Sequence, residues 1–113
     1  MKVVEFAREG AEAITRFESV GAASVALGDG RGEAHVHAVH FEPGGRIGRH
    51  PTGFAQLFLV VEGRGWVEGE DGARRELAAG QGAWFALGEH HAKGSDHGMI
   101  AVMIQVRELE PRD

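Results

Sequence analysis

Residues 44–63 read GGRIGRHPTGFAQLFLVVEG and carry the first half of the pattern that decides the fold. Their glycines and polar residues follow the spacing G-x5-H-x-T-x3-Q-x6-G, which begins at Gly44. Glycine at both ends favours tight turns, because it adopts backbone conformations that other residues avoid. Residues 57–61 are a continuous apolar run with the composition of a strand buried on both faces. The stretch therefore predicts a turn, a polar segment around His50 and a buried strand.

Residues 80–95 read GQGAWFALGEHHAKGS and follow the spacing G-x5-A-x-G-x2-H-x3-S. Gly88 allows a sharp turn, after which the ring of His91 can point back towards the first stretch. Residues two apart in an extended chain point to the same side, which pairs His50 with Thr52. Since alternate residues of an antiparallel barrel point inwards, side chains from the two stretches can converge in its interior.

The rest of the chain predicts short strands joined by turns. Residues 33–42 alternate around apolar positions, Asp71-Gly72 is a hairpin signal, and residues 99–106 form a last β-branched strand. Residues 1–30 hold only short candidate strands, which we assign to the N-terminal edge of the sheet. No segment demands a helix of about ten residues or more. We therefore expect an all-β fold, an antiparallel jelly-roll barrel, in one domain that spans residues 1–113.

Composition excludes several functions. The chain has 113 residues, which suits one domain, and no cysteine, which excludes disulfides and thiolate metal sites. A formal charge of −5 without a basic stripe argues against nucleic acid as a partner. The sequence shows neither a run of about 18 apolar residues nor a signal-peptide pattern, so we expect no membrane span and a cytoplasmic location. Seven histidines are an excess that points to metal binding or proton transfer.

Both spaced stretches resemble the two sequence motifs of the cupin family, G-x5-H-x-H-x3/4-E-x6-G and G-x5-P-x-G-x2-H-x3-N. All spacings agree, but four side chains differ: Thr52 replaces His, Gln56 replaces Glu, Ala86 replaces Pro and Ser95 replaces Asn. The resemblance implies a cupin-like jelly-roll barrel. It also implies that four residues occupy the places that hold a divalent metal in typical members: His50, Thr52, Gln56 and His91.

The side chains of this quartet predict a weakened metal site. Two imidazoles are good ligands for zinc, iron, manganese, nickel or copper, and His50 and His91 supply them. Thr52 offers a neutral hydroxyl and Gln56 a neutral amide oxygen, so no carboxylate balances the charge of the ion. We expect three-ligand binding of a divalent transition metal, completed by water, as one possibility and an interior without metal as the other.

Two functions follow from these possibilities. In the first, the barrel binds a metal and a small oxygenated molecule and acts as a metal-dependent oxygenase or isomerase. In the second, it is a metal-free module that binds a small molecule and does no catalysis. We expect the ligand pocket to include four residues that come from several strands: His37, Phe58, Trp84 and Phe85.

Two further questions stay open at this level. His35 and His37 lie two apart on one strand and share a face, but the sequence leaves open whether that face is inside or outside. Pairing through a sheet edge, either residues 99–104 or the N-terminal strands, predicts a homodimer.

Overall fold

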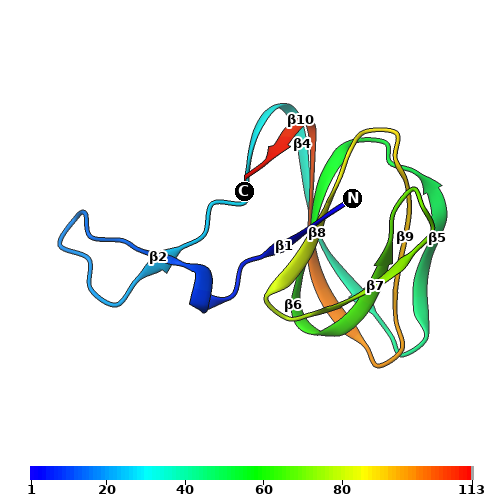
Figure 1. Ribbon diagram of the computed structural model, residues 1–113, viewed down its shortest axis with the longest axis horizontal. Coiled ribbons are helices and arrows are strands. Elements are labelled where there is room, and N and C mark those ends of the chain that lie inside the picture. Colours follow the sequence, from blue (N-terminus) through cyan, green and yellow to red (C-terminus); the bar gives the residue numbers. More distant parts are fainter. Residues whose placement is uncertain (113) are drawn as a thin grey trace.

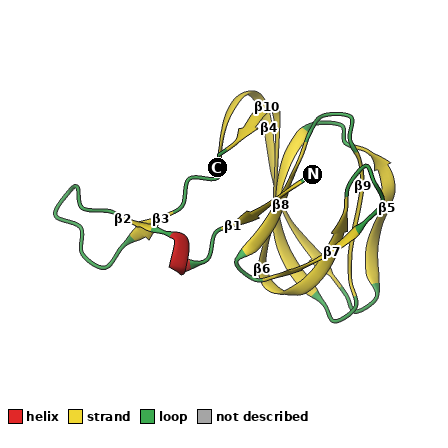
Figure 2. Ribbon diagram, viewed as in Figure 1, coloured by secondary structure: helices red, strands yellow, loops and turns green. Residues whose placement is uncertain are grey.

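The computed structural model describes residues 1–112, and Figure 1 shows their arrangement. Strands dominate, as Figure 2 shows. The elements are β1 (Lys2–Glu5), the short 3-10 helix η1 (Arg8–Gly10), β2 (Glu12–Ala13), β3 (Ala23–Ser24), β4 (Gly28–Phe41), β5 (Gly45–Pro51), β6 (Ala55–Glu68), β7 (Arg74–Ala78), β8 (Gln81–Phe85), β9 (His90–Ser95) and β10 (Met99–Pro111). Within residues 1–112, no helix has the length and apolar character needed to cross a membrane.

The barrel consists of two antiparallel layers that share one long strand. The larger layer has the order β1-β8-β6-β10-β4. The first half of β6 pairs with β8 and β10, whereas its second half pairs with β7 and β9, and β9 pairs with β5 on its other side. Because β6 belongs to both layers, it closes the structure into a barrel (Figure 1). The predicted all-β antiparallel fold is confirmed.

Alternation along β6 separates an inner core from an outer one. Phe58 and Val60 are fully buried in the inner cluster, together with Phe85 and Ala101 from the neighbouring strands. The intervening side chains of β6, Leu57 and Leu59, belong to a second cluster on the outer face of the same sheet, together with Val106 and Leu109 of β10. Burial on both faces explains the apolar run over residues 57–60, whereas Val61 at its end is exposed.

The sheet edges differ from those expected. Residues 99–104 belong to β10, which pairs with β4 on one side and with β6 on the other. The expectation that this segment forms a free edge is therefore wrong. The outermost strands of the large layer are β1 and β4. Within this layer, their outer backbone groups are available to a further strand.

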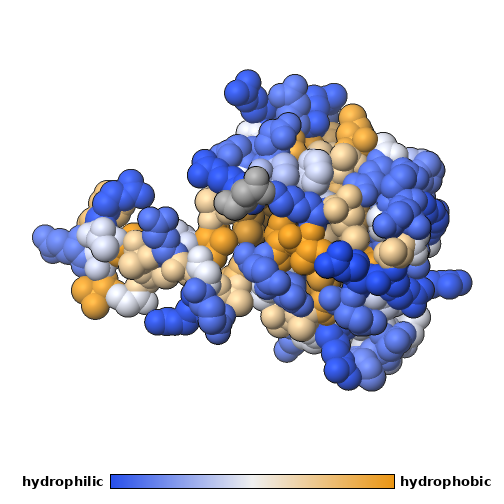
Figure 3. Space-filling model, viewed as in Figure 1, coloured by the Kyte–Doolittle hydropathy of each residue, from blue (hydrophilic) through white to orange (hydrophobic). Residues whose placement is uncertain are grey.

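An arm formed by residues 7–27 projects from the barrel (Figures 1 and 2). Its two short strands, β2 and β3, pair only with each other. Phe17 and Val20 belong to the loop that connects these two strands, and they are 86% and 94% exposed. Figure 3 shows apolar side chains gathered on the face turned to the viewer, beside the place where the arm leaves the barrel. Of residues 1–30, therefore, only β1 and the start of β4 contribute strands to the barrel layers.

Backbone conformation explains why glycine occupies two positions of the spaced stretches, Gly63 and Gly88. Gly63 has a φ of +78° and a Cβ there would collide with the carbonyl of Gly98, so this position excludes other residues. Gly88 has a φ of +83° and turns the chain between β8 and β9. This turn brings β9 back beside β5 and thereby positions His91.

Candidate functional site

The structure brings His50 and His91 together across two paired strands. They are direct partners in the β5–β9 register, and their Nε2 atoms are 3.3 Å apart. His91 is buried, whereas His50 is exposed. The pair therefore connects the interior of the barrel with solvent.

Lys93 extends this pair into the core. It lies two residues after His91 on β9, so both side chains point to the same side of the strand. Its Nζ is 2.7 Å from Oε1 of Gln56 and 3.3 Å from Nδ1 of His91. All three side chains are at most 2% exposed. A buried polar cluster therefore occupies the place that the resemblance gives to a metal ion.

The hydrogen bonds determine which nitrogen of each imidazole carries the proton. His50 Nδ1 lies 2.7 Å from the carbonyl of Gly48, which only accepts, so Nδ1 carries a proton, and in the neutral ring Nε2 is then an acceptor. His91 must then donate from Nε2, and its Nδ1 accepts from the ammonium of Lys93. The result is one continuous donor chain that runs from Lys93 through His91 and His50 to Gly48.

Burial shifts the proton affinity of both interior groups. Loss of solvation lowers the pKa of Lys93 from its ordinary 10.5 to about 7. Burial, followed by repulsion from the ammonium of Lys93 and from the ring of His50 when that ring is protonated, lowers the pKa of His91 from 6.5 to about 3. His91 is therefore neutral at physiological pH, which agrees with its role as both donor and acceptor.

Aromatic rings surround the ammonium group. Nζ of Lys93 lies 5.0 Å from the centroid of Phe58 and 5.1 Å from that of Phe85, distances at which a cation interacts with the ring quadrupole. Within residues 1–112, no carboxylate forms an ion pair with Lys93. Its charge is thus balanced only by an amide, an imidazole and aromatic faces.

Thr52 forms hydrogen bonds that join two segments of the chain. Its hydroxyl donates to the carbonyl of Glu89 at 2.5 Å, and its backbone N–H donates to the same carbonyl at 2.8 Å. In return, the N–H of Gly88 donates to the carbonyl of Thr52. Thr52 therefore ties the segment before β6 to the turn between β8 and β9. Glu89 itself accepts from the N–H of Ala86 and pairs with the N-terminal amine.

His35 and His37 lie on the same face of β4 as Val39, which packs against the inner core. They extend the inner face of the barrel, but both are exposed. In the strand register Gln105 lies between His35 and Gln56. Both rings thus belong to the open end of the barrel, and the ring of His35 contacts Phe54.

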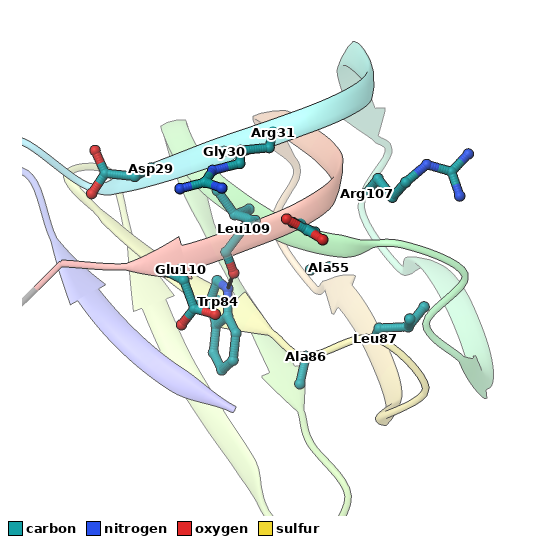
Figure 4. Close-up of a pocket in the computed structure, with 11 residues that line it drawn as sticks. Asp29, Gly30, Arg31, Ala55, Trp84, Ala86, Leu87, Arg107, Leu109 and Glu110 are labelled. Atoms are coloured by element: carbon teal, nitrogen blue, oxygen red, sulfur yellow. Dashed lines mark hydrogen bonds between the residues drawn. The ribbon is translucent and has the colours of Figure 1, made fainter.

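Trp84 lies apart from the other expected pocket residues. It packs against the outer cluster, and its indole N–H donates to the carbonyl of Leu109 at 3.1 Å. Phe85, its neighbour, points inwards. The expectation that Trp84 and Phe85 line one cavity is wrong, because adjacent residues of a strand face opposite sides. Trp84 instead lines a separate surface pocket of about 710 Å³ between β8 and the ends of β4 and β10 (Figure 4).

A divalent metal does not fit this arrangement of side chains. Two imidazole nitrogens 3.3 Å apart suit one tetrahedral ion, but Nε2 of His91 carries the proton. The opposite tautomer would turn an N–H of His91 against the ammonium of Lys93. Oε1 of Gln56 and the hydroxyl of Thr52 are also engaged elsewhere. In the described part of the chain, no three His, Cys, Asp or Glu side chains group as potential metal ligands.

Sequence reasoning missed Lys93, although a usable signal was present. It is the only charged residue among the four that follow His91, and it shares the strand face of that histidine. Its burial depends on the pairing of β9 with both β5 and β6, which local sequence does not reveal.

Comparison with known proteins supports the fold. No family model matches the chain. An (R)-mandelonitrile lyase of Granulicella tundricola is 40% identical over 58 residues, which are 51% of this chain and 44% of that protein. The chain thus matches less than half the length of that relative.

Solved structures show the same architecture at low sequence identity. An RmlC-like cupin from Shewanella frigidimarina has a TM-score of 0.63 and 22% identity, with coverage of 67% of this chain and 68% of that one. A protein with a double-stranded β-helix domain from Klebsiella pneumoniae has a TM-score of 0.60 and 20% identity, with coverage of 84% and 88%. A cupin-like protein from Thermotoga maritima has a TM-score of 0.62 and 22% identity, with coverage of 70% and 64%. The chain therefore has the fold of the cupin barrels.

Proposed function

We propose that the barrel interior binds a small oxygenated molecule and needs no divalent metal to do so. The observation that carries this proposal is the hydrogen-bonded chain of Lys93, His91 and His50. It uses the imidazole nitrogens that a metal would need, and it leaves a set of polar groups next to apolar walls. Such a combination is the usual composition of a small-molecule site.

The burial gradient supports entry from the side of His50. This ring is exposed, whereas His91 and Lys93 behind it are buried. A ligand that enters from solvent meets the imidazole of His50 first and the interior cation last. Phe58 and Phe85 supply the apolar surface that shields a bound molecule from water.

The test combines elemental analysis with a ligand screen on untagged protein. We expect no stoichiometric iron, manganese, nickel, copper or zinc, and we expect small hydroxy or oxo compounds to raise the melting temperature. His91→Ala should remove this ligand-dependent shift, while His40→Ala, an exposed histidine on the opposite face of β4, is the matched control. A stoichiometric metal that is lost in both His50→Ala and His91→Ala would instead favour the metal-dependent oxygenase or isomerase.

A second candidate is a lyase that cleaves a cyanohydrin. It is favoured by the identity with the mandelonitrile lyase and by the exposed ring of His50, whose Nε2 can take a proton from a ligand once it releases the N–H of His91. In such a reaction a base takes the hydroxyl proton, the carbonyl forms, and the C–C bonding electrons leave with cyanide, which then takes a proton. Release of hydrogen cyanide from mandelonitrile, measured for the wild type and for His50→Ala, tests this candidate.

We also propose that the protein forms a homodimer in which the arm packs on a second copy. The arm exposes Phe17 and Val20, and Val36 on the outermost strand β4 is 67% exposed. Apolar side chains exposed to this degree are typical of contact surfaces when they lie close together. A cytoplasmic location stays a prediction from the cysteine-free composition.

A further inference from the structure

We propose that Lys93 is the counter-ion for a small carboxylate, so that the ligand of the barrel interior is a monoanion of one to about three carbon atoms. This inference rests on the proposed function, because it names the chemical class of the ligand at the same site.

The first argument is an incomplete charge balance. Lys93 is 1% exposed and forms no ion pair with a carboxylate in residues 1–112. A buried ammonium is costly unless an opposite charge accompanies it. The amide oxygen of Gln56 and the rings of Phe58 and Phe85 supply only partial negative charge. An anionic ligand would provide the missing charge.

The second argument is the supply of unused donors. An ammonium group has three N–H donors, and Lys93 directs two of them at Gln56 and His91. Because Gln56 accepts through Oε1, its Nε2 group carries two further donors, which are not used by Lys93 or His91. The two sets of donors belong to groups in direct contact. They can therefore serve the two oxygens of one carboxylate.

The third argument concerns size. Phe58, Phe85 and Ala83 line the inner core and have no exposed surface. These buried walls leave little space beside Lys93. A carboxylate with a short chain meets this limit, whereas a bulky anion does not.

The experiment compares glycolate with glycolamide, which have almost the same shape and differ in charge. Isothermal titration calorimetry of the wild type should show that glycolate binds at least about tenfold more tightly. Lys93→Met should remove this preference. Lys2→Met is the matched control, since Lys2 is the only other lysine, and it should keep the preference.

A second readout separates binding from a folding defect. With only two lysines, the NMR signals of the lysine Cε groups can be assigned from the two variants. Glycolate should shift the Lys93 signal of the wild type, and glycolamide should leave it in place. Equal affinity for both compounds, no saturable binding of glycolate, or an unchanged preference in folded Lys93→Met would each overturn the inference. If neutral hydroxy or oxo compounds still bind, the proposed function stands without it.

Discussion

Lys93 donates a hydrogen bond to the amide oxygen of Gln56 at 2.7 Å in the interior of the barrel. The oxygen that the cupin resemblance assigns to a metal ion therefore faces an ammonium group. When Lys93 is protonated, this contact places a positive charge in the interior of the barrel without any bound ion. It also produces consequences for stability, titration and metal binding that can be measured separately.

The stability of the fold should rise with pH above neutrality. The pKa of Lys93 is about 7 in the folded protein and 10.5 without burial, so the unfolded chain binds more protons between these values. The free energy of unfolding should increase through this window, with a slope of at most about 1.4 kcal/mol per pH unit. Urea unfolding at several pH values measures the slope. Lys93→Met should be more stable than the wild type at pH 7 and should show a flatter profile, whereas a Lys2→Met profile that is equally flat contradicts the assignment.

His91 should remain neutral far into the acid range. Its pKa is lowered to about 3, mainly by burial. Its contribution to stability is fully present above pH 6.5 and is lost as the pH falls towards 3, because the unfolded chain then binds the additional proton. An NMR titration of the histidine rings, assigned with His91→Asn, checks this. Protonation of the His91 ring near pH 6 would contradict its burial in the barrel.

Removal of Lys93 should improve metal binding. In Lys93→Met, Oε1 of Gln56 loses its donor and His91 can adopt the tautomer with a free Nε2. Loss of a positive charge a few ångströms away should raise the affinity for zinc by at least about tenfold. Competition with a chromophoric chelator measures this affinity, and Lys2→Met serves as the control. Equal zinc affinity in the wild type and Lys93→Met would show that Lys93 does not exclude the ion.

Thr52 should matter for stability more than for ligand binding. Thr52→Val keeps the shape but removes the hydroxyl that donates to Glu89, so the unfolding free energy should fall by about 1–2 kcal/mol. Thr52→Ser keeps the donor and should retain most of this stability. Urea unfolding compares the variants. A loss of ligand affinity in Thr52→Val without a loss of stability would indicate a direct role at the site.

The arm should control association. Changing Phe17 and Val20 to serine removes the two most exposed large apolar side chains without touching the barrel. We expect size-exclusion chromatography with light scattering to give a dimer for the wild type and a monomer for this double variant. The melting temperature at low protein concentration should stay the same. A wild-type monomer at micromolar concentration would refute the proposed dimer.

The spaced glycines and the apolar alternation predicted the architecture because both act locally. Gly63 and Gly88 adopt positive φ angles that few other residues tolerate, so they reveal turns directly in the sequence. The apolar run over residues 57–60 indicated a strand covered on both sides. Trp84 and Phe85 are adjacent on β8 and therefore face opposite sides of the sheet, which is why they do not share one pocket.

The polar centre could not be predicted to the same depth. Metal motifs directed attention to Thr52 and Gln56 as ligands, but the donors and acceptors that occupy them come from β9 and from the turn before it. Of the two predicted edges, the N-terminal strand β1 is one, but residues 99–104 are not, because the order of strands depends on pairing between distant segments.

What could be known from the order of the residues was the set of turns, the strand periodicity and the convergence of two motifs. Those features depend on backbone conformation and on the alternation of side chains between the two faces of a strand. Both are specified by residues that are close in the sequence. The partner of Lys93, the proton position on His91 and the exposed arm were decided by the folded barrel. They depend on which strands pair and in what register, and only the balance of burial and hydrogen bonding over the whole chain selects that arrangement.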